Sequence, residues 1–345
     1  MNLIGILSNL LLFMLIFGMT AGSSPESLKY HVQSKTGIFI GMGFQFVVLP
    51  FLAFISVKLF SLDRVIGTVL IIICSSPGGS YSNWWCSLIN ADLSLSVAMT
   101  GASTIFSVVF LPLNVAVYSF LAFSSDDSSL DWASIIVSLG VVLAGIGIGV
   151  LFAFNFSEQQ VFDEENSEHN AREGVVSAQH KKNIILRACT LIGNLSGLAL
   201  ISMSFFLSSS NTKSPIWNRS ASFYAGVSFP GLVALIFSFV TTAFAKNLGK
   251  PERVAISIEV CYQNIGIATS VCLSIYTGDD QAAALGVPLY YGFASMVLLA
   301  VFCFTAFHKN WTYAPANTPL LKALSTSFQM VLTKQQNKEL TELKA

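Results

Sequence analysis

The sequence predicts an all-α polytopic membrane protein, because it carries little charge and contains long apolar runs. Of its 345 residues, 53% are hydrophobic and only 10% are Asp, Glu, Lys or Arg, whereas a soluble domain has roughly 25% charged residues. Several runs approach the length of about 20 residues that a helix needs to cross the hydrocarbon core of a bilayer. The formal net charge is zero, so the composition does not indicate a nucleic-acid partner.

Nine apolar runs predict nine transmembrane helices. The first run lacks a positive n-region and is longer than the apolar segment of a signal peptide, so we expect a membrane helix there. A polar stretch, 157–183, separates the fifth run from the sixth and predicts a disordered loop. The approximate limits of the runs are 3–22, 36–58, 65–90, 93–122, 132–156, 184–207, 219–245, 254–277 and 281–307.

The basic residues predict how the chain is oriented in the membrane. An odd number of spans puts the two ends of the chain on opposite sides. If the N-terminus lies outside, all but four of the 18 Lys and Arg residues fall on the cytoplasmic side, where such residues are in excess. We therefore expect a cytoplasmic loop over 157–183 and a cytoplasmic tail over 308–345. The four that remain outside are Lys58, Arg64, Lys213 and Arg219.

Cysteines and histidines do not form a reactive or metal-binding set in this sequence. All six cysteines lie in apolar segments without a C-x-x-C pair, which predicts free thiols. The four histidines lie in polar stretches at no metal-ligand spacing,. Because no nucleophile, histidine and acid combine at membrane depth, we do not expect an enzyme. Asn218-Arg219-Ser220 matches a glycosylation acceptor on the predicted outer side, and the sequence leaves its occupancy open.

The third run is interrupted by a polar, glycine-rich segment. Its residues are Cys74-Ser75-Ser76-Pro77-Gly78-Gly79-Ser80-Tyr81-Ser82-Asn83. Proline removes a backbone donor, and the glycines lower the cost of leaving the helix. A lone proline favours a simple kink, but Pro-Gly-Gly followed by Ser and Asn favours a discontinuous helix. The freed backbone groups must then be satisfied by protein, water or ligand.

A carboxylate, Glu259, lies in the eighth run, where an ionised side chain needs a partner. Its insertion at a helix centre costs about 2.5–3.5 kcal/mol, and such residues often hold an ion or a proton. Gln263 and Asn264 add neutral oxygens about one turn later. The third and eighth runs lie five spans apart and so have opposite orientations. Interrupted helices at matching places of two inverted halves indicate a transporter binding site.

Two other polar sets fit this picture, although each has a simpler explanation. Ser96 and Thr100 share one face of the fourth run at i, i+4, but hydroxyls there commonly bond back to their own helix carbonyls. Gln45 stands alone between Phe44 and Phe46 in the second run and could make an ordinary interhelical hydrogen bond. The residues alone leave these alternatives open.

In these motifs the sequence resembles the bile acid:sodium symporter family, in order and spacing, from about residue 5 to 310. The resemblance implies two inverted five-helix repeats, the first lacking one helix, with the third and eighth spans as discontinuous crossing helices. Residues 1–156 would form the first repeat plus the fifth span, and 184–307 the remainder of the second repeat. A panel domain of the first, fifth and sixth spans would rock against a core domain. The matching segments are Phe44-Gln45-Phe46, Leu49-Pro50, Ser76–Asn83, Asp92–Thr100 and Glu259–Asn264.

The resemblance also implies two sodium sites that share one carboxylate. The first would use Ser82, Asn83, Ser96, Thr100 and Glu259. The second would use Gln45, Gln263, Glu259 and backbone carbonyls near Val260 and Tyr262. Ser80 and Asn264 would face the substrate, where the N-termini of half-helices suit an anionic group. Sodium takes hard oxygen ligands, and every named side chain offers one.

The resulting prediction is a sodium-coupled symporter of the plasma membrane that imports an organic anion by alternating access. Bile acids, steroid sulfates and small carboxylates are the candidate substrates, and two Na+ ions and the lipid bilayer are the other expected partners. One alternative is a proton-coupled organic anion transporter, which the many oxygens disfavour because a proton carrier needs few ligands. Another is a non-transporting ligand-binding paralogue, for which Cys261 leaves room because it replaces a glycine usual in the family.

Overall fold

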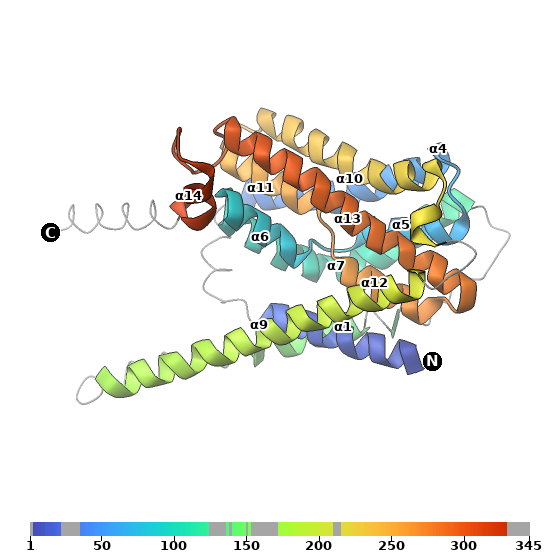
Figure 1. Cartoon of the computed structure of the whole chain (residues 1–345), viewed down its shortest axis with the longest axis horizontal. Coiled ribbons are helices and arrows are strands. Elements are labelled where there is room, and N and C mark those ends of the chain that lie inside the picture. The colour runs from blue at the N-terminus through green and yellow to red at the C-terminus, as the bar shows by residue number, and fades with distance from the viewer. Residues whose placement is uncertain are drawn as a thin grey trace.

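The computed structural model describes residues 3–21, 35–123, 136–137, 140–149, 151–152, 172–209 and 215–329, and every regular element in these ranges is a helix (Figure 1). The elements are α1 (Leu3–Ala21), α3 (Lys35–Gly43), η1 (Phe44–Val48), α4 (Leu49–Leu59), α5 (Arg64–Ser75), α6 (Ser80–Ile89), α7 (Leu93–Phe123), α9 (Arg172–Ser209), η2 (Ile216–Asn218), α10 (Ala221–Thr241), η3 (Thr242–Phe244), α11 (Lys250–Cys261), α12 (Ile265–Ile275), α13 (Gly278–His308) and α14 (Leu320–Ser325).

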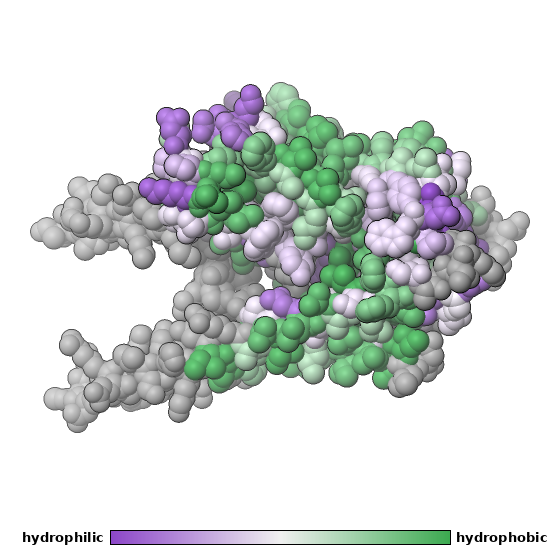
Figure 2. Space-filling view, viewed as in Figure 1, coloured by the Kyte–Doolittle hydropathy of each residue, from purple (hydrophilic) through white to green (hydrophobic). Residues whose placement is uncertain are grey.

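Five helical segments in the described ranges are long and apolar enough to cross a membrane. Hydrophobic side chains cover the middle of the face shown in Figure 2, and hydrophilic ones gather mainly toward the two ends. This is the architecture of a polytopic membrane protein, and the count of nine spans stays a prediction. The five segments are Thr36–Leu59, Leu93–Phe123, Ile184–Ser209, Ala221–Phe244 and Gly278–His308, and the shorter apolar helices are Ile4–Gly18, Arg64–Ser75, Gly140–Gly149 and Ile265–Ile275.

Helices α1 and α9 lie side by side in a layer beneath the other helices (Figure 1). Their backbones approach at two glycines, because a Cβ on Gly18 would lie 2.6 Å from Gly193 Cα. The short helix Gly140–Gly149 joins this layer through Thr20, whose hydroxyl lies 3.3 Å from Gly145 O. Small residues at such contacts let membrane helices pack closely, which matters because in lipid no hydrophobic effect drives the helices together. The described part of the fifth predicted span is therefore packed on the first.

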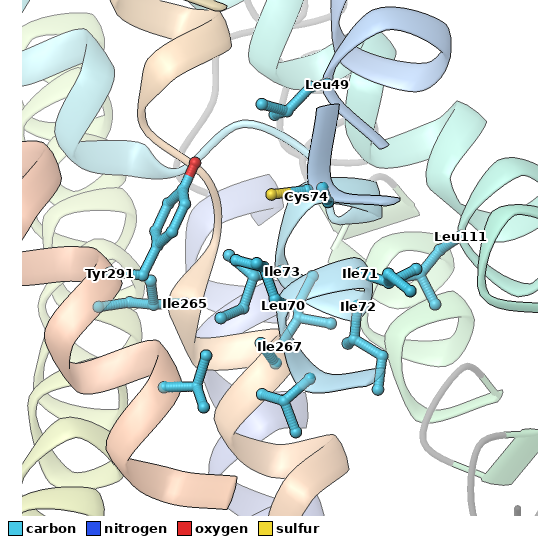
Figure 3. Packing of buried hydrophobic residues seen from close by; sticks show 14 of the residues in the cluster. Leu49, Leu70, Ile71, Ile72, Ile73, Cys74, Leu111, Ile265, Ile267 and Tyr291 are labelled. Atoms are coloured by element: carbon cyan, nitrogen blue, oxygen red, sulfur yellow. The ribbon is translucent and has the colours of Figure 1, made fainter. Parts of the chain in front are cut away.

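The core surrounds α5, which is apolar on all sides and buried on all sides. Leu70, Ile71, Ile72 and Ile73 are each at most 1% exposed, as expected of a helix without a polar face. They pack against side chains from α4, α7, α12 and α13 (Figure 3). This packing fixes the half-helix α5 and therefore the position at which it ends.

The structure corrects one boundary predicted from the sequence. Helix α9 begins at Arg172, so residues 172–183 are helical and not the disordered loop that their polarity suggests. The segment contains Ala, Glu, Gln, Lys and Arg, which are good helix formers, and it extends the apolar part of α9 by several turns. Residues 157–171, the rest of the predicted loop, lie outside the described residues.

The segment that follows α13 packs against the turn between α6 and α7. Asn90 ends α6 in the left-handed conformation, with φ of 60°. Its side chain is 3% exposed; the amide donates to Ala323 O at 2.8 Å, and Oδ1 accepts from Phe328 N at 2.8 Å. Tyr313 lies beside it and donates to Asp92 Oδ2 at 3.0 Å. Burial raises the pKa of the Tyr313 phenol, which keeps this donor protonated.

Replacing Asn90 with alanine is expected to destabilise the protein by about 3 kcal/mol. The substitution leaves two buried backbone groups without partners and puts a Cβ-bearing residue without a compensating side chain in the left-handed region. Thermal unfolding of the purified protein in detergent measures the effect. Asn90→Gly serves as the control, because it removes the same hydrogen bonds but tolerates the backbone, and it should lose less. An unchanged melting temperature in Asn90→Ala would contradict the assignment.

Candidate functional site

The third and eighth predicted spans are each broken into two helices, α5–α6 and α11–α12, and the two breaks lie against each other. Gly78 and Gln263 face each other as an antiparallel bridge. Because a break frees backbone groups that a helix would have paired, these groups need partners inside the protein. The bonds that join the breaks run from Gly79 N to Tyr262 O at 3.1 Å and from Asn264 N to Pro77 O at 2.9 Å.

Both glycines of the first break are required by close approach. A Cβ on Gly78 would lie 2.9 Å from Glu259 Cδ and would overlap Oε1. A Cβ on Gly79 would lie 2.9 Å from the carbonyl oxygen of Gln263 and from the ring of Tyr262. The Pro-Gly-Gly sequence therefore does more than interrupt a helix, since it lets the backbone of one break reach the carboxylate beside the other.

The Glu259 carboxylate is fully buried and is held by two hydroxyl groups of α7. Thr100 Oγ1 donates to Glu259 Oε1 at 2.6 Å, and Ser96 Oγ lies 3.0 Å from Glu259 Oε2. Asn83 of α6 brings a further oxygen, since its Oδ1 lies 2.8 Å from Ser96 Oγ and 3.4 Å from Thr100 Oγ1. Three separate helices, α6, α7 and α11, thus bring their oxygens to one buried position.

At this position one buried carboxylate is surrounded by neutral oxygens. Ser82, Ser96 and Thr100 have one hydroxyl proton each. The acceptors within reach of these hydroxyls are both Glu259 oxygens, Asn83 Oδ1, and the carbonyls of Gly79 and Ser96. Both carbonyls also accept backbone N–H groups, Gly79 O from Ser82 N and Ser96 O within helix α7,. A buried carboxylate needs a compensating charge, so the arrangement is suited to a small cation that takes oxygen ligands.

A π-helical turn, η1, carries Gln45 into the core. Pro50 lacks an N–H and cannot donate to the carbonyl of Phe46 four residues earlier, which explains why the regular α-helix gives way here. The side chain of Asn114 donates to that carbonyl instead, at 2.9 Å. Single π turns inside helices are frequent at functional sites, and this one directs a glutamine, which is 0% exposed, toward the second break.

Gln45 and Gln263 form a second buried polar set. Gln45 Nε2 donates to Gln263 Oε1 at 3.2 Å, and Gln263 Nε2 donates to Val260 O at 2.8 Å. The remaining oxygen, Gln45 Oε1, is buried without a hydrogen-bond partner. The Tyr262 carbonyl already accepts from Gly79 N. Within the described residues no hydrogen bond joins Glu259 to Gln45 or Gln263, so the two sets lie near the same breaks but are separately bonded.

The two residues predicted to face the substrate are less well defined. The side chain of Ser80 lies outside what the structure describes. Asn264 is 6% exposed and caps α12, with its Oδ1 accepting from Ile267 N at 3.3 Å. A Cβ on Gly266 would lie 3.2 Å from that oxygen and 2.6 Å from Leu15 of α1. Asn264 therefore lies where the α1–α9 layer meets the broken helices.

Three residues that satisfy backbone groups at the breaks and at the π turn have no part in the sequence prediction. Ser103 Oγ accepts from Gly78 N at 3.1 Å, and Tyr291 OH donates to the carbonyl of Cys261 at 3.1 Å. Asn114 satisfies the carbonyl freed by Pro50. Ser103 could have been found from the sequence, because it continues the polar face of Ser96 and Thr100 along α7. A proline in a membrane helix also signals a freed carbonyl, but it does not say which side chain will meet it.

Comparison with known proteins gives one matching family and several relatives. The model of the Sodium Bile acid symporter family matches residues 9–213. The chain is 23% identical to the sodium-dependent organic anion transporter of Homo sapiens over 85% of its own length and 70% of that protein. It is 22% identical to the ileal sodium/bile acid cotransporter of Oryctolagus cuniculus, over 92% and 84%. A segment is 36% identical to the P3 protein of Mus musculus, over 36% of this chain and 27% of that protein, so the match spans only about a quarter of the P3 protein.

Proposed function

The chain belongs to the sodium bile acid symporter family, and from this premise we propose that it couples the import of an organic anion to sodium. The proposal follows the names of two relatives, a sodium-dependent organic anion transporter and an ileal sodium/bile acid cotransporter. The anion would be a bile acid, a steroid sulfate or a small carboxylate. Family and relatives are transporters, not enzymes.

The observation that carries this proposal is the cluster of side-chain oxygens around the buried Glu259 carboxylate. Protons bind one or two oxygens, whereas a sodium ion needs several, and side chains from three helices supply them here. In the first proposed sodium site the ligands are Ser82, Asn83, Ser96, Thr100 and Glu259. A bound cation would offset the cost of burying the carboxylate and would join α6, α7 and α11.

The second proposed sodium site lies between the two glutamines. Its ligands would be Gln45, Gln263, Glu259 and the backbone carbonyls of Val260 and Tyr262. The support for it is Gln45 Oε1, a buried oxygen without a partner. Occupation by a cation would require Glu259 to approach this set. A carboxylate shared by two ions would make their binding mutually dependent, which gives coupling its physical basis.

We propose that transport proceeds by movement of the α1–α9 layer against the remaining helices, with the N-terminus outside and the C-terminus cytoplasmic in the plasma membrane. The distribution of Lys and Arg supports this orientation. The layer meets the broken helices along α12, and Asn264 lies at that contact. Ser80 and Asn264, at the starts of the half-helices α6 and α12, would bind the anionic group of the substrate.

The test is uptake into cells or proteoliposomes, with the full chain and with sodium replaced by choline. We expect accumulation of at least one of the three anion classes in sodium only. If two sodium ions accompany a monoanion, an inside-negative potential of 100 mV adds about 2.3 kcal/mol of drive per net charge, so uptake should rise on hyperpolarisation. Uptake that does not depend on sodium but is driven by a pH gradient at fixed sodium would show that the transporter is coupled to protons and not to sodium. Sodium-dependent binding without accumulation would indicate a non-transporting paralogue.

Truncating either glutamine is expected to lower the affinity for sodium more than it lowers the stability of the fold. In Gln45→Ala and Gln263→Ala the sodium concentration for half-maximal uptake should rise about tenfold, because a hydrogen bond or ligand contact to a charged group contributes about 1.5 kcal/mol. The Hill coefficient for sodium should fall toward one. Gln281→Ala is the matched control, because Gln281 is also buried but bonds to Leu273 O and Tyr276 O, away from the breaks. Equal sodium curves in all three variants would exclude the second site.

A further inference from the structure

The first turn of α7 is capped from the far end of the chain. A helix cannot pair its own first four backbone N–H groups. In α7 the side chain of Asp92 accepts one of them, from Leu95 N at 2.9 Å, which is an ordinary N-cap,. Another, Leu93 N, donates to Oε1 of Gln329 at 3.0 Å, across 236 positions of sequence. The N-terminus of this helix is therefore capped in part by a residue that lies beyond α14.

The side-chain amide of Gln329 is fully used in this contact. While its oxygen accepts from Leu93 N, its nitrogen donates to Asp92 Oδ1 at 3.1 Å and to Ser94 Oγ at 3.0 Å. A primary amide has two N–H donors and one carbonyl oxygen, so each part of the group has a partner at the start of α7. Bonds to three successive residues fix the chain segment around Gln329 to this helix end.

The segment that carries Gln329 is also anchored by other contacts. Asn90 Oδ1 accepts from the N–H of Phe328, the residue directly before Gln329, at 2.8 Å. Nearer α13, Trp311 stacks on Phe239 of α10 with ring centroids 4.5 Å apart. Helix α14 lies beside α6 between these two contacts (Figure 1). Because these contacts already order the segment, little further conformational entropy is lost when Gln329 caps α7.

The capped turn leads directly into the first proposed sodium site. The N–H of Ser96 pairs with Asp92 O at 3.1 Å and begins the regular hydrogen bonding of α7. Ser96 Oγ lies 3.0 Å from Glu259 Oε2 and 2.8 Å from Asn83 Oδ1. Thr100, one turn later, donates to the other carboxylate oxygen. Helix ends fray, and fraying of this end would move Ser96, which is the proposed ligand nearest to it.

From these contacts we infer that Gln329 is a positioning residue for this sodium site and acts through α7. Its bonds to Leu93 and Asp92 keep the first turn helical. Ser96 then stays beside Glu259 before an ion binds, so that no part of the binding free energy is spent on ordering the turn. The inference rests on the proposed function for the identity of the ion. It assigns a role in ion binding to the segment after α13, which the sequence predicts only as a cytoplasmic tail.

The test is thermal unfolding of the purified full chain in detergent, with sodium chloride replacing choline chloride at constant ionic strength. In Gln329→Met the side chain keeps its length but loses the amide. We expect its curve of melting temperature against sodium concentration to shift to about fivefold higher sodium, because loss of a cap lowers the population of the ordered turn by about that factor. Thr318→Ala is the matched control. Thr318 lies in the same segment but donates to Pro315 O, at 2.7 Å, so its sodium curve should equal that of the wild type.

A loss of stability in Gln329→Met that is the same with and without sodium would show that the contact supports only the fold, and would overturn the inference. In uptake assays at matched surface expression, half-maximal sodium should rise about fivefold in this variant, while the maximal rate in saturating sodium stays unchanged. Loss of folded protein would instead lower the maximal rate. If the wild type responds to sodium and Gln329→Met follows the same curves, only this inference fails. If the wild type responds to sodium in neither assay, the proposed function fails and the inference fails with it.

Discussion

Replacing Glu259 with glutamine should abolish sodium-dependent uptake while leaving the protein folded. Glutamine keeps the size of the side chain and one acceptor oxygen, and the hydroxyls of Ser96 and Thr100 can rotate to accept from its amide. What is lost is the only charge at the proposed sodium sites. Loss of one partner of a buried charge pair costs about 2–5 kcal/mol, which corresponds to a loss of at least roughly 30-fold in affinity for sodium.

Two measurements separate this effect from misfolding. The amount of protein at the cell surface and the melting temperature in detergent should stay close to those of the wild type. In the wild type, sodium should raise the melting temperature, because a ligand that binds only the folded state stabilises it, and this rise should be absent from Glu259→Gln. A variant that still shows the full sodium-dependent rise, or that transports with sodium, would rule out Glu259 as a sodium ligand.

Introducing a methyl group at Gly78 is expected to have an effect of similar size through a different cause. The new Cβ would lie 2.9 Å from Glu259 Cδ and overlap Oε1, so the carboxylate must leave its position between Ser96 and Thr100. Because the end of a flexible side chain moves more easily than backbone, the fold should survive. We expect the affinity of Gly78→Ala for sodium to fall at least about 30-fold, as in Glu259→Gln, and sodium-dependent uptake to fall with it.

Gly43→Ala provides the matched control for this prediction. Gly43 lies in α3, directly before the π turn, and an added Cβ there meets nothing within 4 Å. Its uptake should therefore equal that of the wild type. Half-maximal sodium and the initial uptake rate should be measured for both variants at matched surface expression. Normal uptake in Gly78→Ala would show that the observed carboxylate position is not needed for transport.

Parts of the fold could be predicted from the sequence because they depend on local chemistry. Apolar runs gave the five segments that are long enough to span, and Pro77 with two glycines located the break after α5. The start of α9 could not be predicted, because polar residues between 172 and 183 are compatible with either a loop or a solvated helix. Helix propensity alone is too weak to decide this.

The candidate site, too, could be predicted only in part from the sequence. The need of Glu259 for a partner is visible in the sequence, because no side chain nearby in the chain can neutralise it. Which groups hold it is not visible, since Ser96 and Thr100 could as well have bonded only to their own helix. In the structure Thr100 Oγ1 lies near both acceptors, 3.0 Å from Ser96 O and 2.6 Å from Glu259 Oε1, and its single proton is donated to the nearer one, the carboxylate.

The sequence by itself determined the membrane class, the break in the third span and the oxygen-bearing residues, because hydropathy, proline and glycine act over a few neighbouring residues. Only the tertiary structure decided which groups meet: Glu259 with Ser96 and Thr100, Asn83 with the same two hydroxyls, and the Phe46 carbonyl with Asn114. Such meetings depend on how helices far apart in the chain pack against each other, and a missing side chain at a glycine matters only once its neighbours are in place.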